Sequence, residues 1–407
     1  MRSAKLSNPT AVSRLLTSGR LRIYPLILIS AFVVLTAAWI LRASDLIDPS
    51  GQVLGADFMA FWSASELASE GRFVDAYDPE QLFEASKRAV PNNESRFIFS
   101  YPPIYGLFIA PLAQLAYPMA WLLWSLTGLA VFVVVLAMLT PAPFRLWLTL
   151  AFPGVYLNII QGQNGLFSAA LLGGAMMSLA SRPILAGVLI GLLTVKPTLG
   201  LLLPLALLCA RQWVAFFAAA ATTLALALTS VLVFGMEPWI AFIGNAGFAS
   251  AMLEQGQLPW AKMPSVFVAL RMLDVGTAVA YAAQGVVAVA VVIAVARGWW
   301  NWRDNPQLAA AMLVAGALLM TPHLNNHDLA VLAIPLAILI ADAGRRPWSG
   351  WEQALLGFAW LAPLVMAPLA DFSHVQIGLL APAATFAIAA RRFAEARVSF
   401  SAINTAV

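Results

Sequence analysis

Two ionisable residues of this sequence stand among apolar or aromatic neighbours, where a charge can do chemistry. Asp57 follows Gly55-Ala56 and precedes an aromatic stretch, and a carboxylate held there can serve as a general base. Lys196 lies in the apolar stretch GVLIGLLTVKPTLGLLLPL, where a charge is costly and functional by default, and its ammonium could hold a phosphate. The alternatives are that Asp57 only caps a helix starting at Phe58 and that Lys196 only extends its charge from a helix end to the polar interface.

Side-chain amides form a second group of candidates. The turn Gln161-Gly-Gln163-Asn164 places three amides between two apolar segments, and amides suit paired donor and acceptor contacts to sugar hydroxyls. Amides are also ordinary loop residues, so this interpretation has a plain alternative. The other polar cluster is His323-Leu-Asn-Asn-His-Asp328, in which His323 and Asn325 are the candidates for leaving-group and sugar contacts.

The histidine cluster does not predict a metal site. His323 and His327 are four residues apart and precede Asp328, but no HExxH motif and no third well-spaced ligand accompanies them. The sequence also lacks an Asp-x-Asp motif and a phosphate-binding glycine-rich loop. We therefore expect no metal and no cofactor. A histidine here would instead donate to an anionic leaving group, because imidazole can be cationic near neutral pH.

The elements that position these residues must lie in a membrane. Of the 407 residues, 61% are hydrophobic and 10% are charged, which is too apolar for a soluble domain of this length. Apolar runs recur from Ile23 almost to the C-terminus, and many match the roughly 17–25 residues that a spanning helix needs. Runs such as 120–139 and 213–234 are apolar all round, which excludes the alternating strands of a barrel. We predict an all-α polytopic membrane protein.

Two further compositional features narrow the class of protein. Cys209 is the only cysteine, so no internal disulfide can form. The net charge of +4 comes from basic residues in short clusters between hydrophobic spans, which argues against a nucleic-acid-binding surface. We expect the chain to be surrounded by the lipid bilayer and to bind no nucleic acid.

The hydrophobic runs predict about twelve crossings. We place them at about 23–42, 118–140, 146–160, 165–181, 184–196, 198–210, 213–234, 277–297, 307–321, 328–343, 351–370 and 376–391. With the N-terminus in the cytoplasm, the basic connections fall inside, at Arg145, Arg182, Arg211, Arg297 with Arg303, Arg345–Arg346 and Arg391–Arg392. The acidic loop 44–103 and all candidate residues then fall outside. This pattern predicts a multi-pass plasma (inner) membrane protein with both termini cytoplasmic and an extracytoplasmic site.

The same pattern predicts the domain organisation. We expect a cytoplasmic tail at 1–22, one transmembrane domain at 23–391 with its first outer loop at 43–117, and a cytoplasmic tail at 392–407. Residues 104–117 are apolar but short and contain Pro111, so we interpret them as re-entrant or interfacial. The loop should contain a short helix from Asp57, whose Phe58, Phe61 and Trp62 face the membrane surface, and a second one from Pro79.

Several motifs, in this order and spacing, resemble glycosyltransferase family 87, the polyprenol-phosphate-mannose-dependent mannosyltransferases of the GT-C superfamily. The motifs are an acidic residue early in the first outer loop, Tyr101-Pro-Pro-Ile-Tyr-Gly, Gln161-Gly-Gln-Asn, and Ala186-Gly-Val-Leu-Ile-Gly-Leu-Leu-Thr-Val-Lys-Pro-Thr. The resemblance covers about residues 50–345. It implies a helical GT-C fold, a lipid-phosphate sugar donor and a catalytic aspartate at Asp57. Many members carry a His-His pair where this chain has His323-Leu-Asn-Asn-His327, and His323 is preferred because it directly follows Thr321-Pro322.

The resemblance implies transfer of a mannose-like hexose from a polyprenyl-phosphate sugar to a lipid or glycan acceptor of the envelope. Asp57 and His323 would be catalytic, and Lys196 with Tyr101 would bind the donor phosphate. Gln161, Gln163, Asn164 and Asn325 would hold sugar hydroxyls. A polyprenyl phosphate leaves without protonation, so one base and some positive charge suffice.

Two other classes of function stay open. A lipid or sugar transporter, or a flippase, would show inverted repeats and charges along a path through the membrane. A noncatalytic partner in envelope polysaccharide assembly would tolerate the neutralisation of Asp57.

Overall fold

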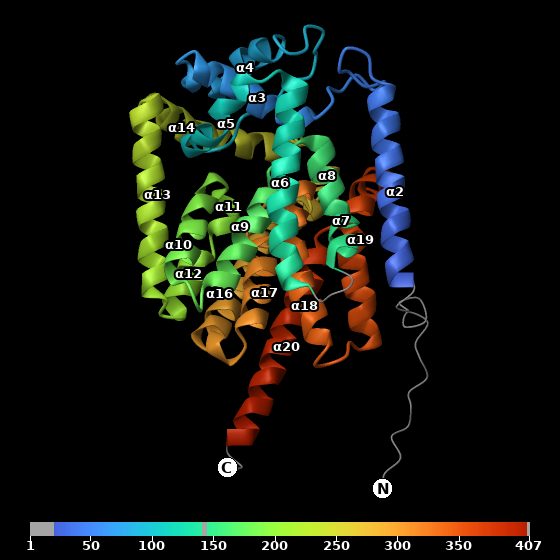
Figure 1. The fold of residues 1–407 in the computed structure, drawn as a ribbon, viewed down its shortest axis with the longest axis vertical. Helices are drawn as coiled ribbons and strands as arrows, with labels where there is room; N and C mark the ends of the chain where they lie inside the picture. The colour runs from blue at the N-terminus through green and yellow to red at the C-terminus, as the bar shows by residue number, and fades with distance from the viewer. Residues whose placement is uncertain (1–19, 141–144, 405–407) are drawn as a thin grey trace.

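The computed structural model describes residues 20–140 and 145–404, and these ranges form helices with no β-strand (Figure 1). The predicted all-α class is confirmed for this part of the chain. Most of the predicted N-terminal tail, the connection 141–144 and residues 405–407 lie outside the described residues.

The helices fall into long, short and 3₁₀ groups. The long helices are α2 (Arg20–Leu41), α6 (Tyr117–Leu139), α13 (Trp213–Phe234), α14 (Glu237–Glu254), α16 (Thr277–Trp300), α19 (Gly350–Ser373) and α20 (Leu380–Asn404). The shorter α-helices are α3 (Ala56–Ser69), α4 (Pro79–Ser86), α5 (Gly106–Ile109), α7 (Arg145–Leu150), α8 (Pro153–Gln161), α9 (Gly165–Ser178), α10 (Pro183–Leu192), α11 (Pro197–Gly200), α12 (Leu203–Cys209), α15 (Val266–Arg271), α17 (Pro306–Ala317) and α18 (Ala333–Ala343). The 3₁₀ helices are η1 (Phe73–Tyr77), η2 (Pro103–Tyr105), η3 (Ala110–Gln114), η4 (Leu193–Val195), η5 (Trp260–Lys262), η6 (Trp302–Asp304) and η7 (Asn326–Leu332).

Six segments in the described ranges are long and apolar enough to cross a bilayer. They are Ile23–Leu41, Tyr117–Leu139, Trp213–Phe234, Thr277–Trp300, Asn326–Ala343 and Gly350–Ser373. Only 6% of the α13 window and 11% of the α2 window is buried, so their apolar side chains need a hydrocarbon solvent. The chain is therefore a multi-pass membrane protein. The remaining predicted crossings fall on shorter helices, or on α20 in the case of 376–391, and the count of about twelve stays a prediction.

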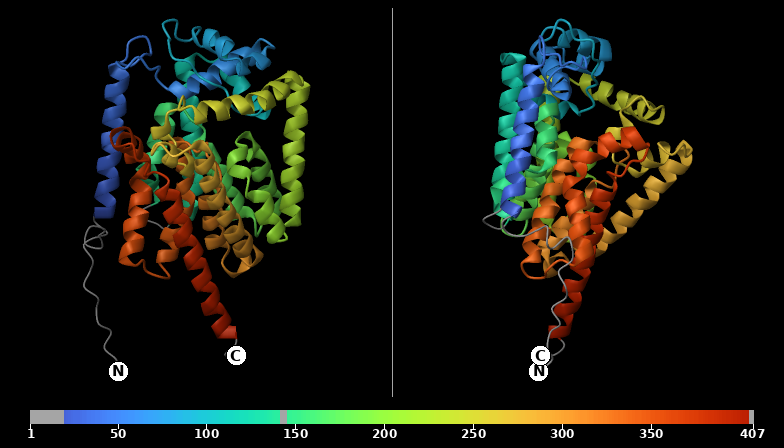
Figure 2. Two further views of the ribbon diagram at one scale, coloured as in Figure 1. Left: turned by 180° about the vertical axis from the view of Figure 1, so that it is seen from behind. Right: turned by 90° about the vertical axis from the view of Figure 1, so that its right-hand side faces the viewer.

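The bundle has two unlike ends. Helix α2 begins and α20 ends at one end, while α3, α4, α5 and α14 cover the opposite end, which we call the α3 end (Figures 1 and 2). The connections α12–α13, α16–α17 and α18–α19 lie away from the α3 end, and they contain Arg211, Arg303 and Arg345. Buried Arg392 of α20 donates to Glu352 there. The grouping of basic connections agrees with the sequence interpretation, and the side of the membrane that each end faces stays a prediction.

Proline and glycine determine where the helices near the α3 end start and stop. Proline is the first residue of α4, α8, α10 and α11, where its fixed φ suits the helix and its missing N–H costs nothing. Helix α8 ends at Gly162, whose φ of 64° is left-handed. Lys196 separates η4 from α11 with a non-helical backbone (φ −132°, ψ 75°), since proline disfavours the α conformation in the residue before it.

The first loop packs on the bundle more tightly than its sequence indicated. Helix α3 begins at Ala56, and the aromatic side chains of Phe58, Phe61 and Trp62 are 0%, 1% and 6% exposed. They contact Tyr117 and other aromatic residues in a second hydrophobic core at the α3 end. The expectation that these rings face the membrane surface was wrong. These rings are buried against protein because the loop supplies enough aromatic partners to cover them.

Residues 104–117 form a chain of short turns rather than one helix. They contain parts of η2 and η3 with α5 between them, and α6 begins at Tyr117. The Tyr117 hydroxyl donates to the carbonyl oxygens of Leu54 and Gly55, at 2.5 and 3.1 Å. Trp62 of α3 also donates from Nε1 to the carbonyl oxygen of Leu115 at 3.0 Å, so the later part of this segment lies against α3.

Reporter fusions test the predicted sidedness. Arg211 and Gly235 flank α13, whose 22 residues extend about 33 Å at 1.5 Å per residue. We expect a reporter that is active only in the cytoplasm to work after Arg211, and one active only outside to work after Gly235. The same reporter active at both positions, or each active at the opposite position, would contradict the topology.

Candidate active site

Polar residues from four separate segments meet at the α3 end. They come from the first turn of α3, the turn between α8 and α9, the break before α11, and the start of η7. We call the group the polar ring: Asp57, Gln163, Asn164, Lys196, Asp328 and His327, with His327 again next to Asp57. Each member is within hydrogen-bond or ion-pair distance of the next. Apart from Asp57 and Gln163 its members are buried, so their electrostatic interactions act in a medium of low dielectric constant.

Asp57 is the accessible carboxylate of the polar ring. Its side chain is 41% exposed, and its Oδ2 accepts a 3.0 Å hydrogen bond from Gln163 Nε2. The residue before α3 is Gly55, and no side chain caps this helix. The alternative in which Asp57 caps the helix is therefore wrong. Asp57 lies in the first turn of α3 instead.

Lys196 is buried and paired. Its ammonium donates to Asn164 Oδ1 at 3.2 Å and forms an ion pair with Asp328. The residue is 8% exposed, so the ammonium does not reach the polar interface as the alternative interpretation required. Because Asp328 neutralises it, Lys196 carries no free positive charge for an anionic ligand.

His327 closes the polar ring between the two carboxylates. Its Nδ1 lies 3.9 Å from Asp57 Oδ2, and its Nε2 lies 3.6 Å from Asp328 Oδ1. Both separations are longer than a hydrogen bond, so they leave the imidazole free to donate elsewhere. The backbone of His327 is fixed by Asn158 of α8, whose Nδ2 donates to its carbonyl oxygen at 2.9 Å.

Two glycines allow the segments to approach closely. A Cβ on Gly162 would lie 2.3 Å from Phe58 Cβ, and one on Gly165 would lie 2.5 Å from the carbonyl oxygen of His327. Any other residue would push the α8–α9 turn away from α3 or from η7. The ordering of Gln163 and Asn164 within the polar ring therefore depends on these two positions.

Two stacked tyrosines form one wall of the site. The rings of Tyr101 and Tyr105 are 4.4 Å apart. The Tyr101 hydroxyl donates to Gln163 Oε1 at 3.2 Å, and Asn164 Nδ2 donates to the Tyr105 hydroxyl at 3.3 Å. Burial raises the pKa of the Tyr101 phenol, which keeps it protonated as a donor. Tyr101, which the resemblance assigned to the donor phosphate, thus orients an amide that contacts Asp57.

Some of the residues predicted from the sequence stand outside the polar ring. The imidazole of His323 makes no hydrogen bond or ion pair to the described residues. Burial lowers the pKa of His323, which favours its neutral form near pH 7, and its catalytic role stays a prediction. Asn325 takes part in the capping box of η7 with Asp328, and Gln161 Oε1 is buried without a partner in the described chain.

The residues that sequence reasoning missed are His327 and Asp328. The sequence offered a signal for Asp328, because an acid in an apolar helix needs a buried partner and Lys196 stood unpaired in another apolar stretch. No comparable signal distinguished His327 from His323. The choice depends on the cap at Asn325, which starts η7 and fixes the position of His327 on its first turn.

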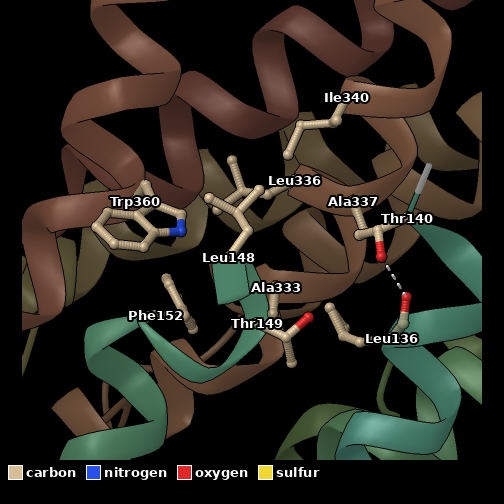
Figure 3. A pocket seen from close by; sticks show the side chains of 10 residues that line it. All are labelled: Leu136, Thr140, Leu148, Thr149, Phe152, Ala333, Leu336, Ala337, Ile340 and Trp360. Atoms are coloured by element: carbon tan, nitrogen blue, oxygen red, sulfur yellow. Dashed lines mark hydrogen bonds between the residues drawn. The ribbon is translucent and has the colours of Figure 1, made fainter. Parts of the chain in front are cut away.

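Neither hollow found among the described residues coincides with the polar ring. One is small, about 20 Å³, and lies between α6, α7, α18 and α19, with Trp360 and Leu336 in its wall (Figure 3). The other, about 770 Å³, separates the first half of α2 from α19. Both are lined almost entirely by apolar side chains. In the described ranges, no three His, Cys, Asp or Glu residues are grouped as metal ligands.

Comparison with known proteins adds one finding. The model of a family described as glycosyltransferase family 87 matches residues 99–322, just over half of the 407 residues. The matched range contains Tyr101, Gln163, Asn164 and Lys196, and it excludes Asp57 and His327. No curated protein and no solved structure matches the chain.

Proposed function

The chain belongs to glycosyltransferase family 87, and we propose that it moves a mannose-like hexose from a polyprenyl-phosphate sugar to an envelope glycolipid or polysaccharide. The observation that carries this proposal is the polar ring. Asp57 and Asp328, from segments remote in the chain, both lie within ion-pair distance of His327 at one end of a membrane-embedded bundle. That position suits a reaction between a lipid-anchored donor and an acceptor at the membrane surface.

Asp57 acts as the general base in this proposal. The acceptor hydroxyl attacks the anomeric carbon of the donor sugar while its proton passes to Asp57. The bond between that carbon and the phosphate oxygen breaks, and its electron pair leaves with the polyprenyl phosphate. Support comes from the exposed side chain of Asp57 and from Gln163, which holds Oδ2 and leaves Oδ1 without a hydrogen bond to the described residues.

The other members of the polar ring position the reacting groups. Gln163 and Asn164 offer amide groups to sugar hydroxyls as well as to the polar ring. Lys196 and Asp328 hold each other and Asn164 in place, so we propose a positioning role for Lys196 rather than direct binding of the phosphate. His327, which is closer to Asp57 than the first choice His323, donates to the leaving phosphate or to the acceptor.

We propose that the site faces the extracytoplasmic side and that the reaction needs no metal. The basic connections at the other end of the bundle support the orientation. A polyprenyl phosphate is a good leaving group without a Lewis acid, which supports metal independence.

Reconstituted protein tests this function directly. We expect the purified chain in vesicles to transfer hexose from a polyprenyl-phosphate sugar to a lipid or glycan acceptor, with product detected by mass spectrometry. A chelator such as EDTA should leave the transfer rate within about twofold of the rate without chelator, because no step of the proposed reaction uses a metal. Absence of product with every polyprenyl-phosphate sugar, together with transfer from a nucleotide sugar, would contradict the proposed donor. Loss of transfer in EDTA that Mg²⁺ or Mn²⁺ restores would contradict metal independence.

A further inference from the structure

A hollow of about 770 Å³ lies between the first half of α2 and the first half of α19, and we call it the α2–α19 hollow. Both helices contain candidate membrane spans. The wall extends from Tyr24 to Ala31 on α2 and from Gln353 to Leu361 on α19, or about 10 and 12 Å at 1.5 Å per residue. The hollow is therefore an elongated space that follows the two helices through part of the bilayer.

Hydrocarbon is the medium that suits this space. Among the lining side chains, only those of Tyr24, Gln353 and two tryptophans carry polar atoms, and apolar cavities stay dry. An empty void of this size would be strongly destabilising. Ile27 and Leu361 in the wall are 60% and 43% exposed, so the hollow opens to the membrane. A lipid chain can therefore enter it from the side.

The first half of α2 lacks the protein contacts that its second half makes. The ring of Phe32 stacks on that of Tyr156 with centroids 4.3 Å apart, and Trp39 packs edge-on against Trp121 at 6.2 Å. Before Phe32, only Pro25 is buried among the α2 residues whose exposure is described. A hydrocarbon chain in the α2–α19 hollow supplies the missing van der Waals contacts and holds the start of α2 against the bundle.

The end of the hollow that lies away from the α3 end carries groups for a lipid headgroup. Gln353 is the fourth residue of α19, and its Oε1 is buried without a hydrogen-bond partner in the described chain. Arg345 is three residues before Trp348, which lines the hollow, so their Cα atoms are within about 11 Å at 3.8 Å per residue. Arg345 is exposed and has no ion-pair partner among the described residues, whereas Arg346 pairs with Glu395. A phosphate and a hydroxyl donor would satisfy these two groups.

We propose that the α2–α19 hollow binds one acyl chain of an anionic phospholipid such as phosphatidylglycerol, with the phosphate on Arg345 and a headgroup hydroxyl donating to Gln353. The first half of α2 and the polar ring lie at opposite ends of the bundle (Figure 1). The bound lipid is therefore neither the sugar donor nor the acceptor, and the inference does not depend on the proposed function.

A glycine in the wall allows the hollow to be filled by mutation. A Cβ on Gly357 would meet no atom within 4 Å, so Gly357→Leu places an isobutyl group in the hollow, and leucine favours the helix more than glycine does. In native mass spectrometry of the purified full-length protein, we expect this variant to bind phosphatidylglycerol at least about tenfold more weakly, because displacing two buried methylenes suffices for that loss. Gly285→Leu is the matched control. Gly285 of α16 also meets no atom within 4 Å and is outside the hollow, so this variant should bind like wild type.

The headgroup charge gives an independent readout. We expect wild type to bind phosphatidylglycerol about fivefold more tightly than phosphatidylcholine with the same acyl chains, as one basic residue at an anionic headgroup contributes. Arg345→Gln should remove most of this preference, and as a surface change it should leave the fold intact. Gly357→Leu should weaken the binding of both lipids and keep their ratio. Arg303→Gln, which changes an exposed arginine between α16 and α17, is the matched control and should keep the preference.

Each of the following results would overturn the proposal. Equal binding of the two lipids by wild type, or an unchanged preference in Arg345→Gln, would remove the headgroup contact. Wild-type affinity in Gly357→Leu would show that no chain occupies the hollow. Losses in Gly285→Leu or Arg303→Gln as large as those in the test variants would show general adhesion of lipid. Displacement of phosphatidylglycerol by an equal concentration of polyprenyl monophosphate would assign the hollow to the donor lipid. None of these measurements requires sugar transfer, so they are separate from failure of the proposed function.

Discussion

Replacing Asp57 by asparagine is expected to lower the rate of sugar transfer by about a thousandfold, within the range of 10²–10⁴ that general bases contribute. Asparagine has nearly the same shape, and its Oδ1 can still accept the hydrogen bond from Gln163 Nε2. It cannot take a proton from an acceptor hydroxyl. The loss should therefore appear in kcat, with the KM for the donor nearly unchanged, in assays of the reconstituted protein.

A second acid of the same loop gives the matched control for Asp57. Asp75 lies in η1, where it pairs with Arg72 at the surface, away from the polar ring. Asp75→Asn makes the same chemical change and should keep the rate within about twofold, because an exposed ion pair contributes little. Equal transfer by wild type and Asp57→Asn would remove Asp57 from the role of base. A loss in Asp75→Asn as large as that in Asp57→Asn would point to the charge of the whole loop instead.

Breaking the pair between Lys196 and Asp328 is expected to destabilise the protein by about 3–5 kcal/mol, the usual cost of leaving one buried charge uncompensated. Lys196→Met leaves the carboxylate of Asp328 without its ion-pair partner, and Asp328→Leu leaves the ammonium of Lys196 without its partner. The double variant removes both charges, so it should regain most of the lost stability. Thermal unfolding of the purified protein measures this as a large fall in Tm for each single variant and a much smaller fall for the double variant.

An exposed pair serves as the control for the buried one. Glu84 of α4 and Lys87, which follows the last residue of this helix, form an ion pair at 2.9 Å with exposed side chains. Lys87→Met should change stability by no more than about 0.5 kcal/mol. If the double variant at Lys196 and Asp328 melted as low as the single variants, loss of packing rather than a stranded charge would be the cause. Single variants as stable as wild type would contradict burial of the pair.

The stable double variant also tests whether Lys196 binds the donor phosphate. If it folds, its polar ring lacks the Lys196–Asp328 pair but keeps Asp57 and Gln163. Its affinity for polyprenyl monophosphate should stay within about threefold of wild type, because removal of one positive and one negative charge leaves the net charge unchanged. Its kcat should fall, because Asn164 loses the ammonium that holds it. A large loss of donor affinity in this variant would indicate that Lys196 binds the donor phosphate.

Much of the architecture was predictable, because the bilayer imposes its requirements on local sequence. A long apolar run must satisfy its own backbone hydrogen bonds, so the helices over 23–42, 118–140, 213–234 and 277–297 could be placed before the fold was known. The short helix from Pro79 was equally local, since proline and the Asp78 cap are neighbours in the chain.

The site was only partly predictable, because some of its contacts join residues that are far apart in the chain. Residue types identified Asp57, Gln163, Asn164 and Lys196, because a charge or an amide next to a long apolar run stands out. The ion pair between Lys196 and Asp328 joins residues 132 positions apart, and no local pattern specifies such a partner. The burial of Phe58 and Phe61 likewise depended on Tyr117 and Trp124, which belong to a different helix.

By itself, the sequence determined that this chain is helical, lies in a membrane and carries an acid, amides and a lysine suited to lipid-linked sugar chemistry. These properties follow from hydrophobicity and from residue type, which act locally. Only the tertiary structure decided that His327 rather than His323 adjoins Asp57 and that Lys196 is already paired with Asp328. Those decisions depend on distances between segments remote in the chain, and electrostatic energy in a medium of low dielectric constant depends steeply on such distances.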